Sequence, residues 1–408
     1  MTRGFLKMTS ILATRLSLIK PSATLAVNSR AIQLKAQGKD IISLGVGEPD
    51  FDTPDFIKAA ASKAMEMGQT KYTLVDGTLA LKDAIIGKFQ RENGLAYSRD
   101  QVTVANGGKQ VIYNAFMASL NPGDEVIIPA PYWTSYPEMV IMAEGTPVIV
   151  ECPGSARFKL ELQQLQQAIT PRTKWLLINS PSNPTGVAYT KEELAALANV
   201  LKDHPHVNIM TDDIYEHILY DGFEFATMAQ VAPFLYDRTL TINGVSKAYS
   251  MTGWRIGYAG GPASLIKAMG VIQSQSTSNP CSISQAAAAA ALEGDQTFLS
   301  EWRQIFKVRR DFVIGQLLSM PGVTCDKPEG AFYVFPDIQS LIGKKTPLGK
   351  TIDSDVSLAT YLLEEGLVAL VPGAAFGLSG HVRISYAASI ETLEKAMHRM
   401  ALAIQALV

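Results

Sequence analysis

Short apolar segments rich in β-branched residues alternate with longer segments of helical periodicity through the middle of the chain. The apolar segments span residues 102–105, 125–129, 146–151, 175–179, 207–212 and 239–243. The helical patterns cover residues 109–119, 191–202 and a stretch through 286–292. Strands that are apolar on both faces and separated by helices are typical of a buried, mostly parallel sheet. The sequence therefore predicts an α/β fold.

The pattern changes after about residue 295. A long helix comes first, and its basic residues are Arg303, Lys307, Arg309 and Arg310. Further elements are expected in the order strand 330–335, helix 355–365, strand 368–371, strand 382–386 and a final helix. This pattern indicates a smaller α+β domain. We expect residues 1–49 to form an N-terminal arm and part of the small domain, 50–295 the large domain, and 296–408 the small C-terminal domain.

The composition excludes several classes of protein. Of the 408 residues, 47% are hydrophobic and 18% are charged, which permits a large core and argues against disorder. The formal net charge of −2 offers no basic field for nucleic acid, and no apolar run reaches the ~18 residues of a membrane span. Cys152, Cys281 and Cys325 are widely separated, which argues against a zinc ribbon or a disulfide scaffold. Three thiols fit a reducing compartment, and we expect a cytoplasmic protein.

The N-terminal segment is basic, because no acidic residue precedes Asp40. Such a start resembles a mitochondrial transit peptide. An N-terminal arm followed by a first helix, with Met8 as an alternative start, also explains the pattern, and we favour this interpretation. The segment lacks the compact apolar core and the small-residue cleavage site of a secretion signal.

Unusual residues collect in the loops that follow the predicted strands, which is where parallel sheets bind ligands. One of these loops, Asn106-Gly107-Gly108-Lys109, ends a strand and begins a helix. Its glycines let the backbone approach a ligand, and the free N–H groups of a helix start favour an anion such as phosphate. A tight turn without a ligand is the alternative. The loop lacks the spacing of a nucleoside-triphosphate site, and Gly45-Val46-Gly47 lacks the third glycine of a dinucleotide site.

An acidic pair, Asp212-Asp213, ends another apolar segment. A carboxylate at this position can hold a positively charged heteroaromatic nitrogen. A shared metal ion is the alternative, but adjacent residues at a strand end point to opposite faces, and so we expect no metal site. His204 and His206 flank a proline in a polar stretch and are expected on a surface loop.

Lys247 follows the last of these apolar segments and precedes a stretch rich in glycine and aromatic residues that contains Arg255. Most lysines are surface cations. A lysine that is partly desolvated and held among cations loses proton affinity, and its amine becomes a nucleophile toward a carbonyl. Arg255 would then be a second group that holds an anion.

In their order and separations, the motifs of the chain resemble those of class I (fold type I) pyridoxal-phosphate-dependent aminotransferases. The motifs are Asn183-Pro184-x-Gly186, Asp212-x-x-Tyr215, Ser246-Lys247 and the segment with Arg255. The chain is most similar to the bacterial aspartate aminotransferase branch with KPSAT near the start, here at 20–24, and NGGKQ at the phosphate turn, here at 106–110. The likeness extends to residues 382–386. It implies a mostly parallel seven-stranded sheet flanked by helices in the large domain, a smaller α+β domain, and pyridoxal 5'-phosphate as cofactor.

The resemblance implies three catalytic residues, Lys247, Asp212 and Tyr215. Lys247 would form the internal aldimine with the cofactor and move a proton, and Asp212 would keep the pyridinium nitrogen protonated. Tyr215 and Asn183 would contact the ring oxygen, and Trp133 would stack on the ring. The phosphate would be held by groups from several loops and from the neighbouring subunit of a homodimer, namely Gly107, Gly108, Lys109, Arg255 and, from that subunit, Tyr72.

The resemblance also implies the substrate contacts. Arg383 would bind the α-carboxylate through two parallel hydrogen bonds, and the groups beside it would be Gly47, Asn183 and Trp133. Lys109, with Ser22 and Thr24, would meet a second carboxylate. The chain departs from many relatives at Gly244, three residues before the lysine, where they carry a hydroxyl side chain. The phosphate anchor is therefore expected to differ in detail.

Transamination between aspartate and 2-oxoglutarate is the function that we expect. Prephenate transamination, an aromatic or alanine-type aminotransferase and a lyase on the same fold are the alternatives within the family. A catalytically silent regulatory relative is the non-enzyme alternative, and the intact Lys247, Asp212 and Arg383 argue against it. The expected partners are small amino acids, 2-oxo acids and a second copy of the chain.

Overall fold

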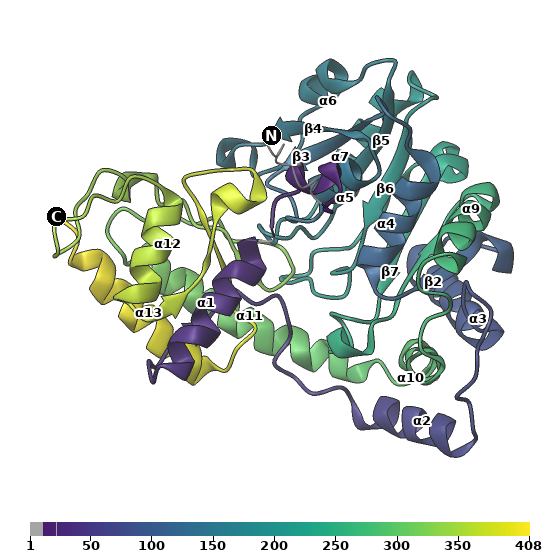
Figure 1. Ribbon diagram of the computed structural model, residues 1–408, viewed down its shortest axis with the longest axis horizontal. Helices are drawn as coiled ribbons and strands as arrows, with labels where there is room; N and C mark the ends of the chain where they lie inside the picture. The colour runs from purple at the N-terminus through teal and green to yellow at the C-terminus, as the bar shows by residue number, and fades with distance from the viewer. Residues whose placement is uncertain (1–10, 22) are drawn as a thin grey trace, which may run out of the picture.

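The computed structural model describes residues 11–21 and 23–408. Its largest sheet has seven strands in the order β2-β8-β7-β6-β5-β3-β4 (Figure 1). The strands are β2 (Val102–Ala105), β3 (Glu125–Ala130), β4 (Thr146–Glu151), β5 (Thr173–Asn179), β6 (Asn208–Asp212), β7 (Thr239–Gly244) and β8 (Gly257–Gly260). Neighbouring strands are parallel, except that β8 is antiparallel to both β2 and β7. The prediction of an α/β fold with a mostly parallel sheet is confirmed.

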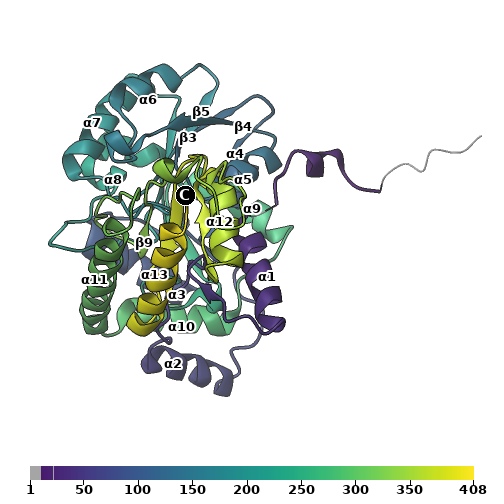
Figure 2. The ribbon, with the colours of Figure 1, turned by 90° about the vertical axis from the view of Figure 1, so that its left-hand side faces the viewer.

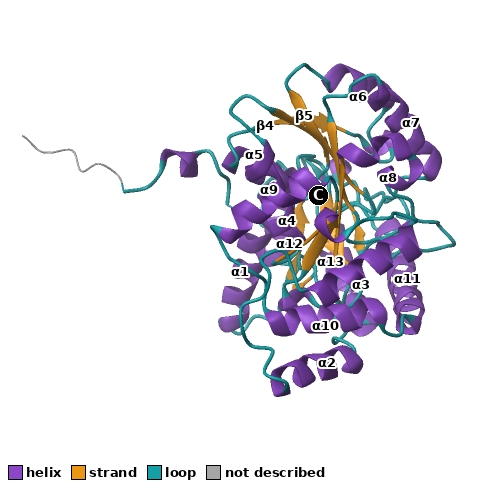
Figure 3. Cartoon of the chain, turned by 90° about the vertical axis from the view of Figure 1, so that its right-hand side faces the viewer, coloured by secondary structure: helices purple, strands orange, loops and turns teal. Residues whose placement is uncertain are grey.

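Alternate residues of the central strands contribute to two apolar layers. Val126 and Ile128 of β3 pack in one layer with α4, α5 and α9, whereas Ile127 packs in the opposite layer with α6, α7 and α8. Figure 3 shows these helices on the two sides of the sheet. Their bounds are α4 (Gly108–Ser119), α5 (Tyr136–Met142), α6 (Leu162–Ala168), α7 (Lys191–Lys202), α8 (Met228–Val231) and α9 (Ala263–Ser274). Burial on both faces explains why these strands lack polar alternation.

A third group of helices packs beside β2 and closes this end of the sheet. The group consists of α2 (Asp55–Glu66), α3 (Leu79–Lys88) and α10 (Ser282–Glu293). We call the part of the chain from α2 through α10 the sheet unit. The expected helices at 109–119, 191–202 and 286–292 correspond to α4, α7 and α10.

The remaining elements form a C-terminal unit, which we define as α1, β1 and the chain from α11 onward. Its helices are α1 (Ala23–Ala36), α11 (Thr297–Leu318), α12 (Asp355–Glu364) and α13 (Ile390–Gln405). Its strands are β1 (Ile42–Ser43), β9 (Tyr333–Val334), β10 (Val368–Ala369), β11 (Val371–Pro372) and β12 (Val382–Ser385). β1 pairs with β10, and so an N-terminal strand lies within the C-terminal unit. The domain limits at 49/50 and 295/296 stay a prediction.

Two predicted strands differ from the structure. The strand expected at 330–335 is restricted to β9, because the backbone of Gly330 and Ala331 bonds to loops of the sheet unit and Ala331 has a φ of 55°. The single strand expected at 368–371 is wrong. β10 pairs with β1 and β11 pairs with β12, so the chain changes sheets at Leu370.

Residues 11–21 precede α1 and include a short helical turn, Thr14–Ser17, that projects from the body of the molecule (Figure 2). Within residues 11–21 and 23–408, no helix combines the length and apolar character needed to cross a bilayer. The three cysteines are free thiols.

Candidate active site

A cavity of about 370 Å³ lies where the carboxyl ends of the central strands face the C-terminal unit. Asp212 ends β6 and Lys247 follows β7, and both side chains line this cavity. Arg383 reaches it from β12 on the opposite wall. The other predicted site residues that line it are Thr24, Gly47, Gly108, Lys109, Trp133, Asn183, Tyr215 and Arg255. The fold thus brings residues from distant parts of the sequence to one place.

Lys247 lies on the wall of the cavity with its Nζ donating to the carbonyl oxygen of Gly47 at 2.6 Å. Burial lowers the pKa of its ammonium to about 8, and Arg383 and Arg255 act in the same direction while Glu48 opposes them. A fraction of the amine is therefore neutral near pH 7. That is the state in which a lysine acts as a nucleophile or a base.

Asp212 is buried at the floor of the cavity, and the Tyr136 hydroxyl donates to its Oδ2 at 2.6 Å. Burial raises the pKa of this carboxyl to about 6, and the hydrogen bond from Tyr136 opposes that shift. Asn179 donates to the backbone oxygen of Asp212 at 2.7 Å. Asp213 lies outside the cavity lining and accepts from Thr211. Only the first member of the acidic pair therefore lines the cavity.

The turn before α4 forms an anion cradle. Gly107 has a φ of 84°, and a Cβ at this position would lie 2.4 Å from Nη2 of Arg255. Arg255 donates to the backbone oxygens of Thr252 (2.8 Å) and Asn106 (3.4 Å), which holds its guanidinium beside the helix start. Lys109 Nζ lies 4.9 Å from the ring centroid of Trp133. Free N–H groups and two cations at one helix N-terminus suit a phosphate group.

Gly244 is the position where the chain departs from the expected hydroxyl residue. A Cβ there would lie 3.0 Å from the oxygen of Ile256 and 3.1 Å from Cα of Gly257. β7 and β8 thus approach closely at Gly244, and a larger side chain would require the neighbouring backbone to shift by a few tenths of an ångström.

Arg383 is 2% exposed and lies on the C-terminal wall of the cavity. Its Nη1 donates to Oδ1 of Asn183 at 2.8 Å, and its Nη2 donates to the oxygen of Gly45 at 2.5 Å. Its Nε has no hydrogen-bond partner within the described part of the chain. A buried donor without a partner is costly, so this atom points to a ligand with acceptor oxygens.

Two predicted residues, Tyr72 and Gly107, are not among the residues that line the cavity. Tyr72 is 91% exposed and outside the cavity of its own chain. Ser22 lies outside the described residues, whereas Thr24, two positions later, lines the cavity.

Residues 39–400 match the family model described as aminotransferase class I and II. The chain belongs to this family. An "Aspartate/prephenate aminotransferase" of Cereibacter sphaeroides is 61% identical over 391 residues, covering 96% of this chain and 98% of that protein. An "Aspartate aminotransferase" of Rhizobium meliloti is 57% identical, covering 96% of this chain and 95% of that one.

Solved structures agree with this family membership. The crystal structure of the aspartate aminotransferase from Rhizobium meliloti has a TM-score of 0.96 at 56% identity, covering 98% of this chain and all of that one. The Thermus thermophilus aspartate aminotransferase with maleate has a TM-score of 0.90 at 45% identity, covering 97% of this chain and 100% of that one.

Aminotransferases of this family depend on pyridoxal phosphate, and the residues in the cavity fit that group. The cradle of Gly107 and Arg255 suits its phosphate, the Asp212 carboxylate suits a pyridine nitrogen, and the Lys247 amine suits its aldehyde. This fit rests on the chemical groups of these residues and on Gly107, which leaves room for a phosphate beside Arg255.

Sequence reasoning missed two tyrosines that line this aminotransferase cavity, Tyr136 and Tyr333. Tyr136 stands three residues after Trp133, and the two rings meet edge to face at 5.2 Å between centroids. Trp133 precedes α5, so the two rings do not form a helical pattern, and the hydrogen-bond partner of Tyr136, Asp212, lies 76 residues away. Tyr333 lay within a predicted strand, and nothing in its neighbours marked it as a site residue.

One group outside the cavity has ligand atoms at metal-binding separations, namely Glu92, Glu216 and His217. The ammonium of Lys88, which is fully buried, pairs with Glu216 and lies 3.6 Å from Glu92. The two carboxylates are therefore already compensated by a cation of the chain itself.

Proposed function

We propose that this aminotransferase transfers the amino group of aspartate to 2-oxoglutarate with pyridoxal phosphate as cofactor. The observation that carries the proposal is a set of cations facing one cavity without carboxylate partners in the described residues, namely Lys109, Arg255 and Arg383. Uncompensated cations in a partly buried site favour anionic ligands. A phosphate and two substrate carboxylates account for all of them.

The cofactor would be held by groups on the sheet unit. Gly107, Gly108, Lys109 and Arg255 would hold its phosphate, with Tyr72 of a neighbouring copy. Asp212 would keep the ring nitrogen protonated, Asn183 and Tyr215 would bind the ring oxygen, and Trp133 would stack on the ring. When bound, this group supplies an electron sink for the substrate Cα and accepts the amino group.

Lys247 is the base in this proposal. Its lowered pKa leaves a fraction of Nζ neutral, and this atom takes the proton from the substrate Cα and returns it during amino transfer. Burial of the site keeps bulk water from competing for the same proton. Arg383 fixes the α-carboxylate and so presents the Cα hydrogen to Lys247.

Substrate specificity would come from the two ends of the cavity. Arg383 binds the α-carboxylate, and Gly47 also lines this part of the cavity. A larger residue would not fit at position 47, because its Cβ would lie 2.5 Å from the hydroxyl of Tyr333. Lys109, Thr24 and Ser22 would receive the distal carboxylate. Desolvation of a second carboxylate is unfavourable without such a partner.

Prephenate is a second candidate acceptor, because relatives at 57–61% identity are named aspartate/prephenate aminotransferases. Prephenate also carries two carboxylates, and the same pair of cations would receive them. We propose a homodimer with shared sites, since Tyr72 is 91% exposed and lies outside the cavity lining of its own chain. We also propose a cytoplasmic location.

A substrate panel tests the function. The purified protein, loaded with pyridoxal phosphate, is assayed with aspartate, glutamate, alanine and phenylalanine as donors and with 2-oxoglutarate, oxaloacetate and prephenate as acceptors. We expect the highest kcat/KM with aspartate and 2-oxoglutarate. Preference for alanine or phenylalanine would assign the alanine or aromatic type, and absence of turnover together with bound cofactor would identify a silent relative.

A further inference from the structure

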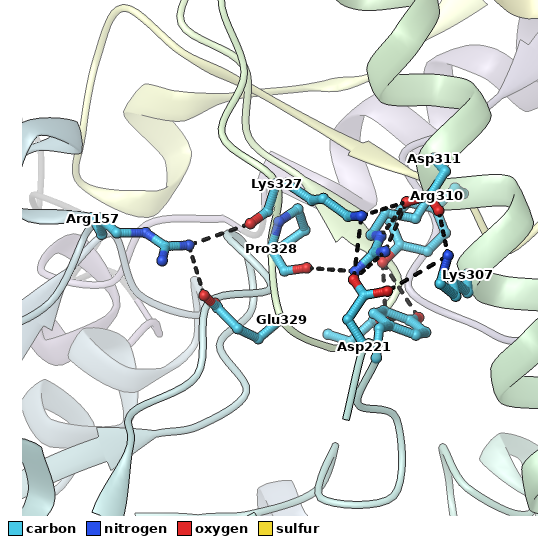
Figure 4. A network of polar contacts seen from close by, with 11 residues as sticks. Arg157, Asp221, Lys307, Arg310, Asp311, Lys327, Pro328 and Glu329 are labelled. Carbon is cyan, nitrogen blue, oxygen red and sulfur yellow. Dashed lines mark hydrogen bonds and ion pairs between the residues drawn. The ribbon is translucent and has the colours of Figure 1, made fainter. Parts of the chain in front are cut away.

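We call residues 327–331 the strap. Almost every backbone carbonyl group of the strap accepts a hydrogen bond from another part of the chain. Arg157 donates to the oxygen of Lys327 at 3.2 Å, and Arg310 donates to the oxygen of Pro328 at 2.9 Å (Figure 4). The oxygen of Glu329 accepts from the backbone of Tyr220 at 2.9 Å. Arginines from both units therefore hold the strap from two sides.

Arg310 is itself held in place. It is fully buried, and its Nη2 donates to Oδ2 of Asp221 and to Oδ1 of Asp311, each at 2.7 Å. Its Cζ lies 4.6 Å from the ring centroid of Tyr220. Figure 4 shows this cluster of charges around the strap. A buried arginine with its donors paired is a rigid support, because breaking one contact would leave a charge uncompensated.

Close packing fixes the strap further. A Cβ on Gly330 would lie 2.6 Å from the oxygen of Ile218, and the Gly330 N–H donates to Gly186 at 2.8 Å. The Ala331 N–H donates to Ile218 at 2.9 Å, and its oxygen accepts from the hydroxyl of Tyr386 at 3.0 Å. The strap therefore leaves Tyr333, two residues later, little freedom to move.

Tyr333 touches two groups to which the proposed function gives roles. Its hydroxyl shares a hydrogen bond of 2.8 Å with the hydroxyl of Tyr215, in which either oxygen can donate. Its ring centroid lies 4.6 Å from Cζ of Arg383, and the side chain is fully buried. Hydroxyl and ring thus contact different partners.

We propose that Tyr333 is a positioning residue that orients the Tyr215 hydroxyl through its own hydroxyl and the Arg383 guanidinium through its ring. The inference rests on the proposed function, because that function gives Tyr215 and Arg383 their ligands. A hydroxyl offers one proton and two lone pairs, so a hydrogen bond from Tyr333 leaves the proton of Tyr215 free for a ligand. The face of an aromatic ring attracts a guanidinium and fixes its plane.

Tyr333→Phe tests the hydroxyl, because it removes one oxygen and keeps the ring. We expect the pH midpoint of the visible absorbance of the cofactor-loaded protein to move in the same direction as in Tyr215→Phe, by a smaller amount. We also expect kcat to fall about three- to tenfold and the Kd for maleate to change less than about twofold, as one lost hydrogen bond implies.

Tyr361→Phe is the matched control, since its hydroxyl donates to the oxygen of Ala403 at 3.0 Å within the C-terminal unit. It also loses one buried hydroxyl, but it touches neither Tyr215 nor Arg383, so we expect the parent's pH midpoint. A midpoint for Tyr333→Phe equal to those of the parent and this control would overturn the role of the hydroxyl.

Tyr333→Leu tests the ring. We expect the Kd for maleate, measured by absorbance titration, to rise about tenfold relative to Tyr333→Phe, because Arg383 loses the nearer of two aromatic neighbours and keeps the other, Phe376. Equal maleate affinity in the two variants would overturn the role of the ring. If the Leu variant does not fold, Tyr333→Met replaces it, because methionine has about the same volume as leucine and also lacks an aromatic ring. Its maleate affinity is then compared with that of Tyr333→Phe.

The outcome is separate from that of the proposed function. If the parent fails to use aspartate, the proposed function is wrong. The pH midpoints and maleate titrations still test whether Tyr333 positions its two neighbours, because neither measurement requires turnover.

Discussion

The two walls of the cavity hold their proposed functional groups in different ways. On the sheet-unit wall, these groups lie within a few residues of a strand end or a helix start. On the C-terminal wall, they belong to short strands that are fixed by contacts with distant parts of the chain. Asp212 ends β6, and Lys247 follows β7 by three residues. Arg383 and Tyr333 instead come from β12 and β9, and Tyr333 is placed by the strap and its charged cluster. The comparison indicates that parallel strand ends place Asp212 and Lys247, whereas long-range polar contacts place Arg383, the proposed partner of the substrate α-carboxylate.

This difference predicts that the two walls fail differently. Changes to Lys247 or Asp212 on the sheet wall should remove the reaction step. Changes to Arg383 on the C-terminal wall should weaken or misplace the substrate while the cofactor stays bound.

The largest effect is expected for Lys247→Ala. The variant loses the amine that we propose attaches the cofactor and acts as the base at the substrate Cα, so turnover should fall at least about 1,000-fold. Visible absorbance of the loaded protein and steady-state rates with aspartate measure the two losses. Retention of more than a few per cent of the rate would remove Lys247 from its role.

The second effect concerns the acidic pair. Asp212→Ala removes the carboxylate that faces the cavity, and the rate should fall about 100-fold or more because the electron sink is weakened. Asp213→Asn is the control, since Asp213 lies outside the cavity lining. If Asp213→Asn loses the rate and Asp212→Ala keeps it, the wrong member of the pair has been assigned.

Arg383→Lys tests the C-terminal wall. Lysine keeps the charge but loses the parallel hydrogen bonds to the α-carboxylate, which should lower kcat/KM by roughly 2–4 kcal/mol. The absorbance of the bound cofactor should stay that of the parent, in contrast to Lys247→Ala. An unchanged kcat/KM would contradict the carboxylate site, and loss of the cofactor would contradict the division between the walls.

Tyr136→Phe should have the smallest effect of this series. The hydrogen bond from Tyr136 lowers the pKa of Asp212, which stands at about 6. Its loss should raise that pKa further, because the charged carboxylate loses a donor. The acid limb of the kcat/KM profile should therefore move to higher pH, with about a threefold loss at pH 7. A profile identical to that of the parent would show that Tyr136 does not support Asp212.

The sheet wall was also the more predictable from sequence. The strands at 102–105 and 146–151 match β2 and β4, because short runs rich in β-branched residues carry a strong local signal. β2 is buried throughout, whereas β4 is an exposed to half-buried edge strand. The short strand β8 was missed, since Gly257–Gly260 contains two glycines and no β-branched residue.

The missed site residues depend on contacts between distant parts of the chain. Tyr136 bonds to a residue 76 positions away and Tyr333 to one 118 positions away, and neither separation leaves a periodic pattern. Tyr72 differs again, because its proposed role needs a second copy of the chain.

The central claim is that the cavity accepts a dicarboxylic substrate, and the most direct test is the ratio of kcat/KM for aspartate to that for alanine in Lys109→Ala and in the parent. Lys109 lies beside Trp133, and burial and Arg255 lower its pKa, so a distal carboxylate would relieve an unfavourable cation. At saturating pyridoxal phosphate we expect the ratio to fall by a factor corresponding to roughly 2–5 kcal/mol. An unchanged ratio, with both substrates slowed alike, would mean that Lys109 only neutralises phosphate and would contradict the assignment of the dicarboxylate site.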